Sequence, residues 1–227
     1  MFFYDYYYII LVVPAILISI FAQTKVQSTY KKYAKVMSKS GLTAHEVTRR
    51  ILDKAGLTNV GIEHVNGTLT DHFDPTKNVI RLSDSVYGDA SVASLGVAAH
   101  EAGHAVQYAV GYTPIKLRNT VLPAANIGSR LSVPLILLGI IFSIRPLITF
   151  GILLFSLVLL FQLITLPVEF DASRRALKVL GETNILDSEE LSGSKKVLSA
   201  AAMTYVAAAL LSAMQLLRLV LISRRRN

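Results

Sequence analysis

The chain of 227 residues contains no cysteine. Disulfide bonds and thiolate metal sites are therefore excluded, and any zinc site must be built from histidine and carboxylate ligands. Charged residues are also scarce, at 17%, whereas hydrophobic residues make up 52% of the chain and the mean hydropathy is +0.49. This composition is too apolar for an ordinary soluble protein, so we predict a membrane protein.

The N-terminus lacks the basic region and the small-residue cleavage site of a secretory signal peptide. Its only early charge is Asp5, and the sequence ending at Ala22 is poor for cleavage. Residues 1–22 are therefore expected to be retained as a transmembrane anchor, opened by tyrosines that suit a membrane interface. The lysines that follow are Lys25, Lys31, Lys32, Lys35 and Lys39. By the positive-inside rule they place residue 23 onward in the cytoplasm.

The net charge of +8 would suggest a nucleic-acid partner in a soluble protein. Here, however, the basic residues lie beside apolar segments, after the anchor and at Arg224 to Arg226. This placement indicates membrane topology and contact with anionic lipid, and no nucleic-acid partner is expected.

An H-E-x-x-H pentad, His100 to His104, lies inside a helix-like run from Ser91 to Ala109 that is otherwise uncharged. Residues four apart share a helical face, so the two imidazoles can converge on one metal ion. Glu101, rotated by about 100°, can reach a water at that metal and act as its general base. The pentad predicts a hydrolase with one Zn²⁺ per chain. The alternative is two exposed histidines that flank a solvated glutamate.

A catalytic zinc usually takes three protein ligands, so a third is needed. Glu169 is the preferred candidate because it opens a helix-like pattern directly after an apolar segment. Alternatively, Glu169 and Asp171 merely favour a helix N-terminus. Lone histidines are more often structural, and acidic clusters are often solvated helix starts. The weaker candidates of these two kinds are His45, His64 and His72, and Asp187, Glu189 and Glu190.

Residues 41–110 indicate an α+β portion. Thr43 and Glu46 form a capping box ahead of a short amphipathic helix. Strands rich in β-formers should follow and form a small antiparallel sheet, before the helix that carries the pentad. The three strands are expected at Val60 to Val65, Leu69 to Phe73 and Val79 to Leu82. Sheet followed by active-site helix is the zincin order.

The apolar segment 131–167 predicts two transmembrane legs, each somewhat short, joined by an external turn at Arg145-Pro146. A hairpin returns Glu169 to the membrane face that carries the pentad. The last apolar stretch, Val197 to Ile222, is long enough to span, but spanning would place the terminal arginines outside. We therefore prefer a helix packed on the catalytic domain or on the membrane surface.

These observations divide the chain into four parts. The anchor comprises residues 1–22, and a cytoplasmic zincin-like catalytic portion comprises residues 23–130. The transmembrane hairpin follows over residues 131–167. Residues 168–227 hold the third-ligand helix and a C-terminal membrane-associated helix.

Four segments together resemble the YugP-like neutral zinc metallopeptidases of bacterial membranes. They are Asp71 to Pro75, Val79 to Ser83, Val97 to Gln107 and Leu166 to Ser173, and the resemblance covers most of residues 40–220. It implies a multi-pass zinc endopeptidase of the bacterial cell membrane with a gluzincin domain, acting on peptide or protein substrates.

The resemblance also implies roles for particular residues. His100, His104 and Glu169 would hold the zinc, and Glu101 would be the catalytic base. More distantly the chain looks like the heat-shock protease HtpX and the CAAX prenyl proteases, whose motif is E-x-x-x-D. Ser173 stands in the place of that Asp, which in those relatives orients a zinc-bound histidine. Asp171 or a backbone carbonyl could serve here instead.

Two further elements of a peptidase site are left open by the sequence. A donor for the developing oxyanion could come from His72, Arg174 or Tyr205. An exposed sheet edge between His72 and Arg81 could bind an extended substrate by strand addition.

Two other functions compete with a membrane-bound peptidase. An intramembrane site-two-type protease would carry the pentad in a transmembrane helix and an aspartate in a second apolar segment, yet no acidic residue interrupts Leu131 to Pro167. A non-catalytic membrane scaffold would carry the motif incidentally and bind no zinc.

Overall fold

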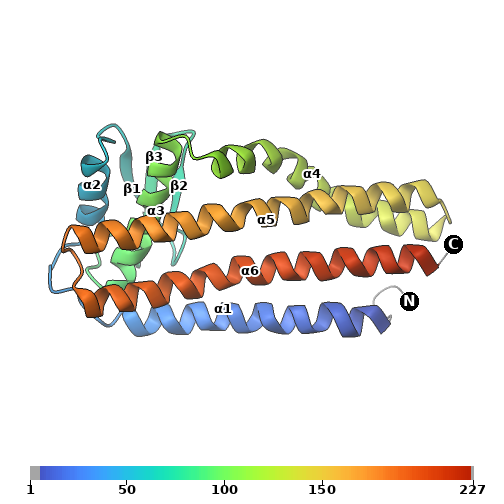
Figure 1. Cartoon of the computed structure of the whole chain (residues 1–227), viewed down its shortest axis with the longest axis horizontal. Helices are drawn as coiled ribbons and strands as arrows, with labels where there is room; N and C mark the ends of the chain where they lie inside the picture. The colour runs from blue at the N-terminus through green and yellow to red at the C-terminus, as the bar shows by residue number, and fades with distance from the viewer. Residues whose placement is uncertain (1–5, 226–227) are drawn as a thin grey trace. The chain divides into compact units, whose positions relative to one another are not determined.

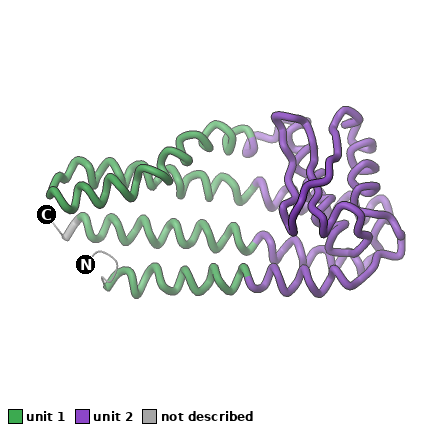
Figure 2. Tube along the Cα trace, turned by 180° about the vertical axis from the view of Figure 1, so that it is seen from behind, with its two compact units in different colours: residues 1–23, 116–167, 203–227 green, residues 24–115, 168–202 purple. Residues whose placement is uncertain are grey.

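The computed structural model describes residues 6–225. Tyr4 of the expected anchor and Arg226 of the terminal arginine run lie outside the described residues. The chain divides into two compact units, which Figure 2 distinguishes by colour. Unit 1 comprises Met1–Gln23, Lys116–Pro167 and Met203–Asn227, and unit 2 comprises Thr24–Ile115 and Val168–Ala202. Some helices therefore belong to one unit over part of their length and to the other beyond it.

Unit 2 contains the sheet and the pentad helix (Figure 1). Its complete elements are α2 (Ala44–Lys54), β1 (Gly61–Val65), β2 (His72–Asp74), β3 (Val79–Ser83) and α3 (Val92–Ala109). It also includes the last part of α1 (Val13–Tyr33), the last part of α5 (Arg145–Glu182) and the first part of α6 (Ser188–Arg225). One hydrophobic core joins these elements and includes Tyr30, Leu52, Ile80, Leu95, Leu180 and Leu198.

Helices α2 and α3 begin where their capping residues predict. Thr43 accepts a hydrogen bond from the Glu46 backbone N–H, and the Glu46 carboxylate accepts one from the Thr43 N–H, which completes the capping box. The Ser91 hydroxyl caps α3 by accepting from the Ser94 N–H. The predicted start and end of the pentad helix are therefore confirmed.

The sheet is mixed rather than antiparallel. Its strand order is β1-β3-β2, with β1 parallel to β3 and β2 antiparallel to β3. The prediction assumed successive hairpins, but β2 lies within the connection between β1 and β3, so β3 enters the sheet beside β1 in the same direction. Strand β3 carries apolar residues on both faces and is buried, as a central strand should be. Leu69, with φ +56°, lies in a turn, so β2 begins only at His72.

Unit 1 contains η1 (Tyr8–Val12), the first part of α1, most of α4 (Thr113–Ile141), the first part of α5 and the last part of α6. The α4–α5 pair packs closely at glycines. A Cβ at Gly128 would lie 2.4 Å from the Leu154 carbonyl oxygen, and one at Gly151 would lie 2.9 Å from the Ser132 carbonyl oxygen. Such contacts are typical of close transmembrane helix pairs and agree with the predicted hairpin.

The limits of the hairpin differ from those predicted. Helix α4 begins at Thr113 rather than near residue 131, so this leg is not short. Its two internal prolines, Pro123 and Pro134, are accommodated without ending the helix. Arg145 and Pro146 open α5 instead of forming the turn, because proline is well tolerated in the first turn of a helix. The connection is residues 142–144, with Ser143 at φ +56°.

Four helices are long and apolar enough to cross a membrane: Tyr8–Tyr33, Thr113–Ile141, Arg145–Glu182 and Ser188–Ser223. Within the described residues, helix α3, which carries the pentad, is not one of these four. The length and composition of α6 suit a crossing. The surface-packed C-terminal helix therefore stays a prediction, and the length and composition of α6 do not favour it.

Candidate metal centre

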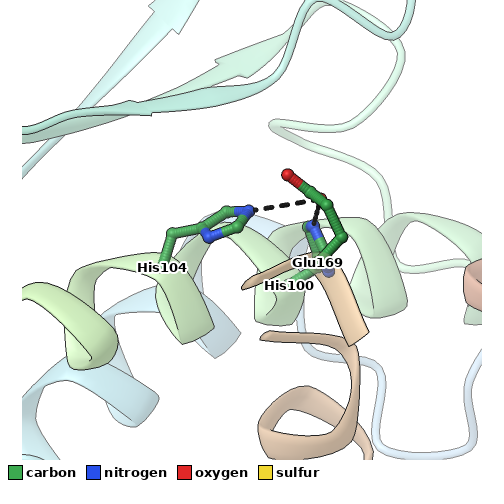
Figure 3. Close-up of side chains that lie close together, drawn as sticks. All are labelled: His100, His104 and Glu169. Carbon is green, nitrogen blue, oxygen red and sulfur yellow. Dashed lines mark ion pairs between the residues drawn. The ribbon is translucent and has the colours of Figure 1, made fainter. Parts of the chain in front are cut away.

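Three potential metal ligands converge between α3 and α5 within unit 2 (Figure 3). His100 and His104 lie one turn apart on α3, and Glu169 lies on α5. The Glu169 Oε2 atom is 3.3 Å from His100 Nε2 and 3.6 Å from His104 Nε2. All three ligand atoms lie within 4.8 Å of one another. Two imidazoles and a carboxylate are a donor set of catalytic zinc sites.

The environment of Glu169 fits a bound cation. Its side chain is 4% exposed, and Oε2 is buried with no hydrogen-bond partner among the described residues, although both histidine rings lie within ion-pair distance. A buried carboxylate oxygen without a hydrogen bond is costly, whereas a metal ion would satisfy it. The side chains of the chain therefore fit a zinc ion at this position.

The potential at the site is negative. Burial acts to lower the pKa of His104, but the carboxylates of Glu169 and Glu101 raise it by more, so the net pKa lies above its ordinary value. Burial also raises the pKa of Asp71, and the charge of Glu101 adds to that effect. Hydrogen bonds from Ser83 to Asp71 oppose the shift. Carboxylates gathered in this way attract a divalent cation.

A glycine inside the pentad lets α5 approach the ligand helix. A Cβ at Gly103 would lie 2.8 Å from the Ala172 carbonyl oxygen and 3.3 Å from the Ala172 Cα. Both of these atoms are backbone, so neither can move aside easily. Because Glu169 precedes Ala172 by three residues on α5, this close approach brings the carboxylate within reach of both histidines. The sequence indicated only small residues here, not the reason for the glycine.

Glu101 is buried but is not one of the three clustered ligands. Its Oε2 atom accepts a hydrogen bond of 3.0 Å from the backbone N–H of Phe73. Phe73 belongs to β2, an edge strand of the sheet, and its ring packs edge-on against Tyr108 of α3. The predicted base is therefore held against the edge strand of the sheet.

Each ligand histidine has a different partner at Nδ1. The His100 Nδ1 atom lies 3.1 Å from the Ser173 hydroxyl, so Ser173 does contact a ligand histidine from the position of the relatives' Asp. The His104 Nδ1 atom lies 3.0 Å from Gln107 Oε1. The Gln107 amide group in turn donates to the Val168 carbonyl and to the Asp171 carboxylate. Asp171 thus contacts His104 through Gln107 rather than directly.

Gln107 was not among the sequence candidates. It is fully buried. Its signal was present, because Gln107 follows His104 by three residues and His100 by seven and so lies on the same helical face.

The remaining candidates are not brought to the ligands. His72 is exposed, with its ring nitrogens at the Thr70 carbonyl and at Arg81. Arg174 donates to Asp171 from a side chain that is 77% exposed. Tyr205 belongs to unit 1 and not to the unit that holds the three clustered residues. His45 lies against Tyr87, and His64 pairs with Asp84. Asp187, Glu189 and Glu190 form the start of α6, where Asp187 accepts hydrogen bonds from the other two N–H groups.

Helix α5 continues past Pro167, so no helix starts at Glu169. The prediction that a helix starts at Glu169 is therefore wrong, and so is the alternative in which Glu169 and Asp171 merely favour a helix N-terminus.

Comparison with known proteins gives two matches. The model of the family described as "Putative neutral zinc metallopeptidase" matches residues 8–224. The chain is also similar to a protein of Bacillus subtilis (strain 168) named "Putative membrane protease YugP". Their identity is 48% over 215 residues, which cover 95% of this chain and 96% of that protein. No solved structure matches the chain. The matched segment contains all three clustered ligands and Glu101.

Proposed function

Because the chain belongs to this family of neutral zinc metallopeptidases, we propose that it is a membrane-bound zinc endopeptidase. The observation that carries the proposal is the convergence of His100, His104 and Glu169, with Glu101 beside them but outside the set. His100, His104 and Glu169 would hold one zinc ion per chain. Zinc, when bound, supplies a Lewis acid that lowers the pKa of a water to about 7 and polarises a carbonyl group.

Glu101 supplies the proton transfers of the proposed reaction. Its carboxylate takes a proton from the attacking water while the water oxygen bonds to the scissile carbonyl carbon. The same proton then passes to the amide nitrogen as the C–N bond breaks, so the immediate products are an amine and a carboxylic acid, which loses its remaining proton to solvent. The hydrogen bond from the Phe73 N–H holds the Glu101 carboxylate in place on the sheet side of the site.

Strand β2 is suited to hold an extended substrate. It is an edge strand, and the Phe73 N–H points away from β3 toward the pentad helix. A peptide added along this edge would pass beside Glu101, and backbone hydrogen bonds would give affinity with little sequence preference. The substrate is therefore proposed to be an unfolded or extended peptide segment.

The proposed location follows from the four apolar helices and the lysines after the first of them. The positive-inside rule puts the start of unit 2 at the cytoplasmic face. The α4–α5 pair crosses and returns, so Glu169 lies at that same face.

A cleavage assay of the full-length protein in detergent tests the proposed reaction. Casein is the substrate, and the zinc-loaded wild type is compared with Glu101→Gln. Loss of a general base typically lowers turnover by about 10²–10⁴-fold, and we expect a loss in this range. Glu182→Gln is the matched control, because the Glu182 side chain is 55% exposed and forms an ion pair with Lys178, outside the cluster of potential ligands. Equal cleavage by wild type and Glu101→Gln would contradict the assigned base.

A further inference from the structure

The side chain of Gln107 connects the two helices that carry the ligands. It lies on α3, is fully buried, and reaches three polar groups. Its Nε2 atom is 2.8 Å from the Val168 carbonyl oxygen and 3.0 Å from Asp171 Oδ2, both on α5. Its Oε1 atom is 3.0 Å from His104 Nδ1. Val168 directly precedes Glu169, so one amide contacts both the proposed ligand His104 and the residue next to the proposed ligand Glu169.

The chemistry of these partners fixes the orientation of the amide. A backbone carbonyl oxygen can only accept hydrogen bonds, so the Gln107 NH₂ group must face Val168, and the neighbouring Asp171 carboxylate lies on the same side. Asp171 also accepts hydrogen bonds from Arg174 and Arg175. The Gln107 oxygen is then left for His104. The flipped amide would place its oxygen against two acceptors and lose two buried hydrogen bonds.

The orientation of the amide in turn fixes the tautomer of His104. An amide oxygen accepts only, so His104 must carry its proton on Nδ1. A neutral imidazole protonated at Nδ1 has its lone pair on Nε2, which is the atom that faces Glu169. Ser173 imposes no such choice on His100, because a hydroxyl can either donate or accept. The protonated ring nitrogen is therefore fixed in His104 but not in His100.

We propose that Gln107 is a positioning residue that holds His104 in the metal-binding tautomer before any metal arrives. Through Val168 it also keeps the Glu169 segment of α5 in register with α3. Asp171, which accepts hydrogen bonds from Arg174 and Arg175, holds the Gln107 amide group in this orientation by accepting a hydrogen bond from its NH₂ group. The consequence for zinc affinity rests on the proposed function, whereas the tautomer is a property of the metal-free protein.

The tautomer can be measured directly in the full-length, metal-free protein. The chain has only 5 histidines, so ¹⁵N-histidine labelling gives a simple long-range ¹H–¹⁵N spectrum. The spectrum is recorded in detergent micelles at alkaline pH, where the rings are neutral, and a His104→Gln variant assigns the signals. We expect a protonated Nδ1 and an unprotonated Nε2 for His104 in the wild type. A proton on Nε2, or an even mixture of tautomers, would overturn the proposal.

Variants then test the cause of the preference. Gln107→Met keeps the length of the side chain but removes the acceptor and both donors, so the His104 tautomers should become mixed. Chelator competition should show zinc affinity falling by about 10–100-fold, the usual effect of losing such a partner. Ser173→Ala is the matched control and should leave the His104 signals unchanged. Unaltered His104 signals in Gln107→Met would also refute the proposal.

The role of Gln107 and the proposed function can be refuted independently of each other. Should Gln107→Met not fold, the wild-type spectrum still decides the tautomer. The expected tautomer in a protein that binds no zinc would refute the proposed function but not the role of Gln107. Zinc binding with the opposite tautomer would refute only the role of Gln107.

Discussion

Unit 2 and unit 1 bury different kinds of residue. Unit 2 buries Glu101, His104, Gln107, Glu169 and Asp171, and most of their polar atoms are paired with groups on another element or on the next turn. The helices of unit 1 bury mostly small and branched apolar residues, among them Ala15, Ala125, Ile136 and Leu219. Chemistry is thus concentrated in unit 2, and packing dominates unit 1. Substitutions in unit 2 should therefore change zinc binding and activity, whereas substitutions in unit 1 should change stability alone.

The side of the membrane from which a residue can be labelled should give the largest difference between the two units, because each position reacts from one side only. The chain has no cysteine, so single cysteines at Ser40 and Ser188, both exposed and in unit 2, can be compared with one at Pro146, exposed and in unit 1. We expect the first two to react only from the cytoplasmic side and the third only from outside. Opposite sides for Ser40 and Ser188 would rule out the crossing-and-return of α4 and α5.

Removal of metal should abolish activity without unfolding unit 1. The proposed zinc contacts only side chains of unit 2, so a chelator should stop casein cleavage completely and added Zn²⁺ should restore it. Circular dichroism of the chelated protein should retain most of its helical signal. Activity that persists after zinc has been removed would place the chemistry outside the proposed centre.

Substitution of a glycine at a close helix contact should affect different measured properties in the two units. Gly103→Ala in unit 2 and Gly128→Ala in unit 1 both force a Cβ against backbone of a neighbouring helix. Each should destabilise its own unit by about 1–3 kcal/mol. Only Gly103→Ala should also weaken zinc binding, because it moves the α5 segment that carries Glu169. Equal zinc affinity in the two variants would contradict the role given to Gly103.

Asp171→Asn should have an intermediate effect on zinc. The neutral side chain weakens the pairs with Arg174 and Arg175 and can turn a donor toward Gln107. Because Asp171 acts on His104 through Gln107, we expect a smaller loss of zinc affinity than the 10–100-fold proposed for Gln107→Met. Chelator competition measures the zinc affinity of both variants under the same conditions. A larger loss of affinity in Asp171→Asn than in Gln107→Met would contradict this prediction.

The smallest effect is expected at the surface of unit 2. Hydrogen bonds from the backbone of Glu190 and from Lys39 lower the pKa of Asp187. Its contribution to stability is thus present above the pKa of the unfolded chain and is lost as the pH falls through the folded pKa. Asp187→Asn should lower the unfolding temperature slightly at neutral pH and not at all in strong acid. A difference that persists in acid would show that charge is not the cause.

Local signals were sufficient to predict the helices around the site. The Thr43 capping box and the Ser91 cap set the starts of α2 and α3, and both depend on residues within one turn. The three residues that cluster in the structure were also named from the sequence, because the pentad is local and Glu169 follows a recognisable apolar segment. The family was identified correctly on the same residues.

Features that depend on distant contacts were missed. The direction of β1 relative to β3 depends on where β2 is placed, and the strand patterns do not encode that choice. The need for glycine at position 103 comes from the backbone of Ala172 on another helix. Gln107 gains its role only when α5 supplies Val168 and Asp171. In each case the partner lies tens of residues away, beyond the reach of helical or strand periodicity.

Zinc content per chain tests the central claim most directly. Wild type, Glu101→Gln and Glu169→Gln are purified in detergent, equilibrated with the same free zinc and measured by metal analysis. The account predicts close to one zinc per chain in the wild type and in Glu101→Gln, because the base does not hold the metal, and a clear loss in Glu169→Gln. Full zinc in Glu169→Gln, or zinc lost from Glu101→Gln, would contradict it.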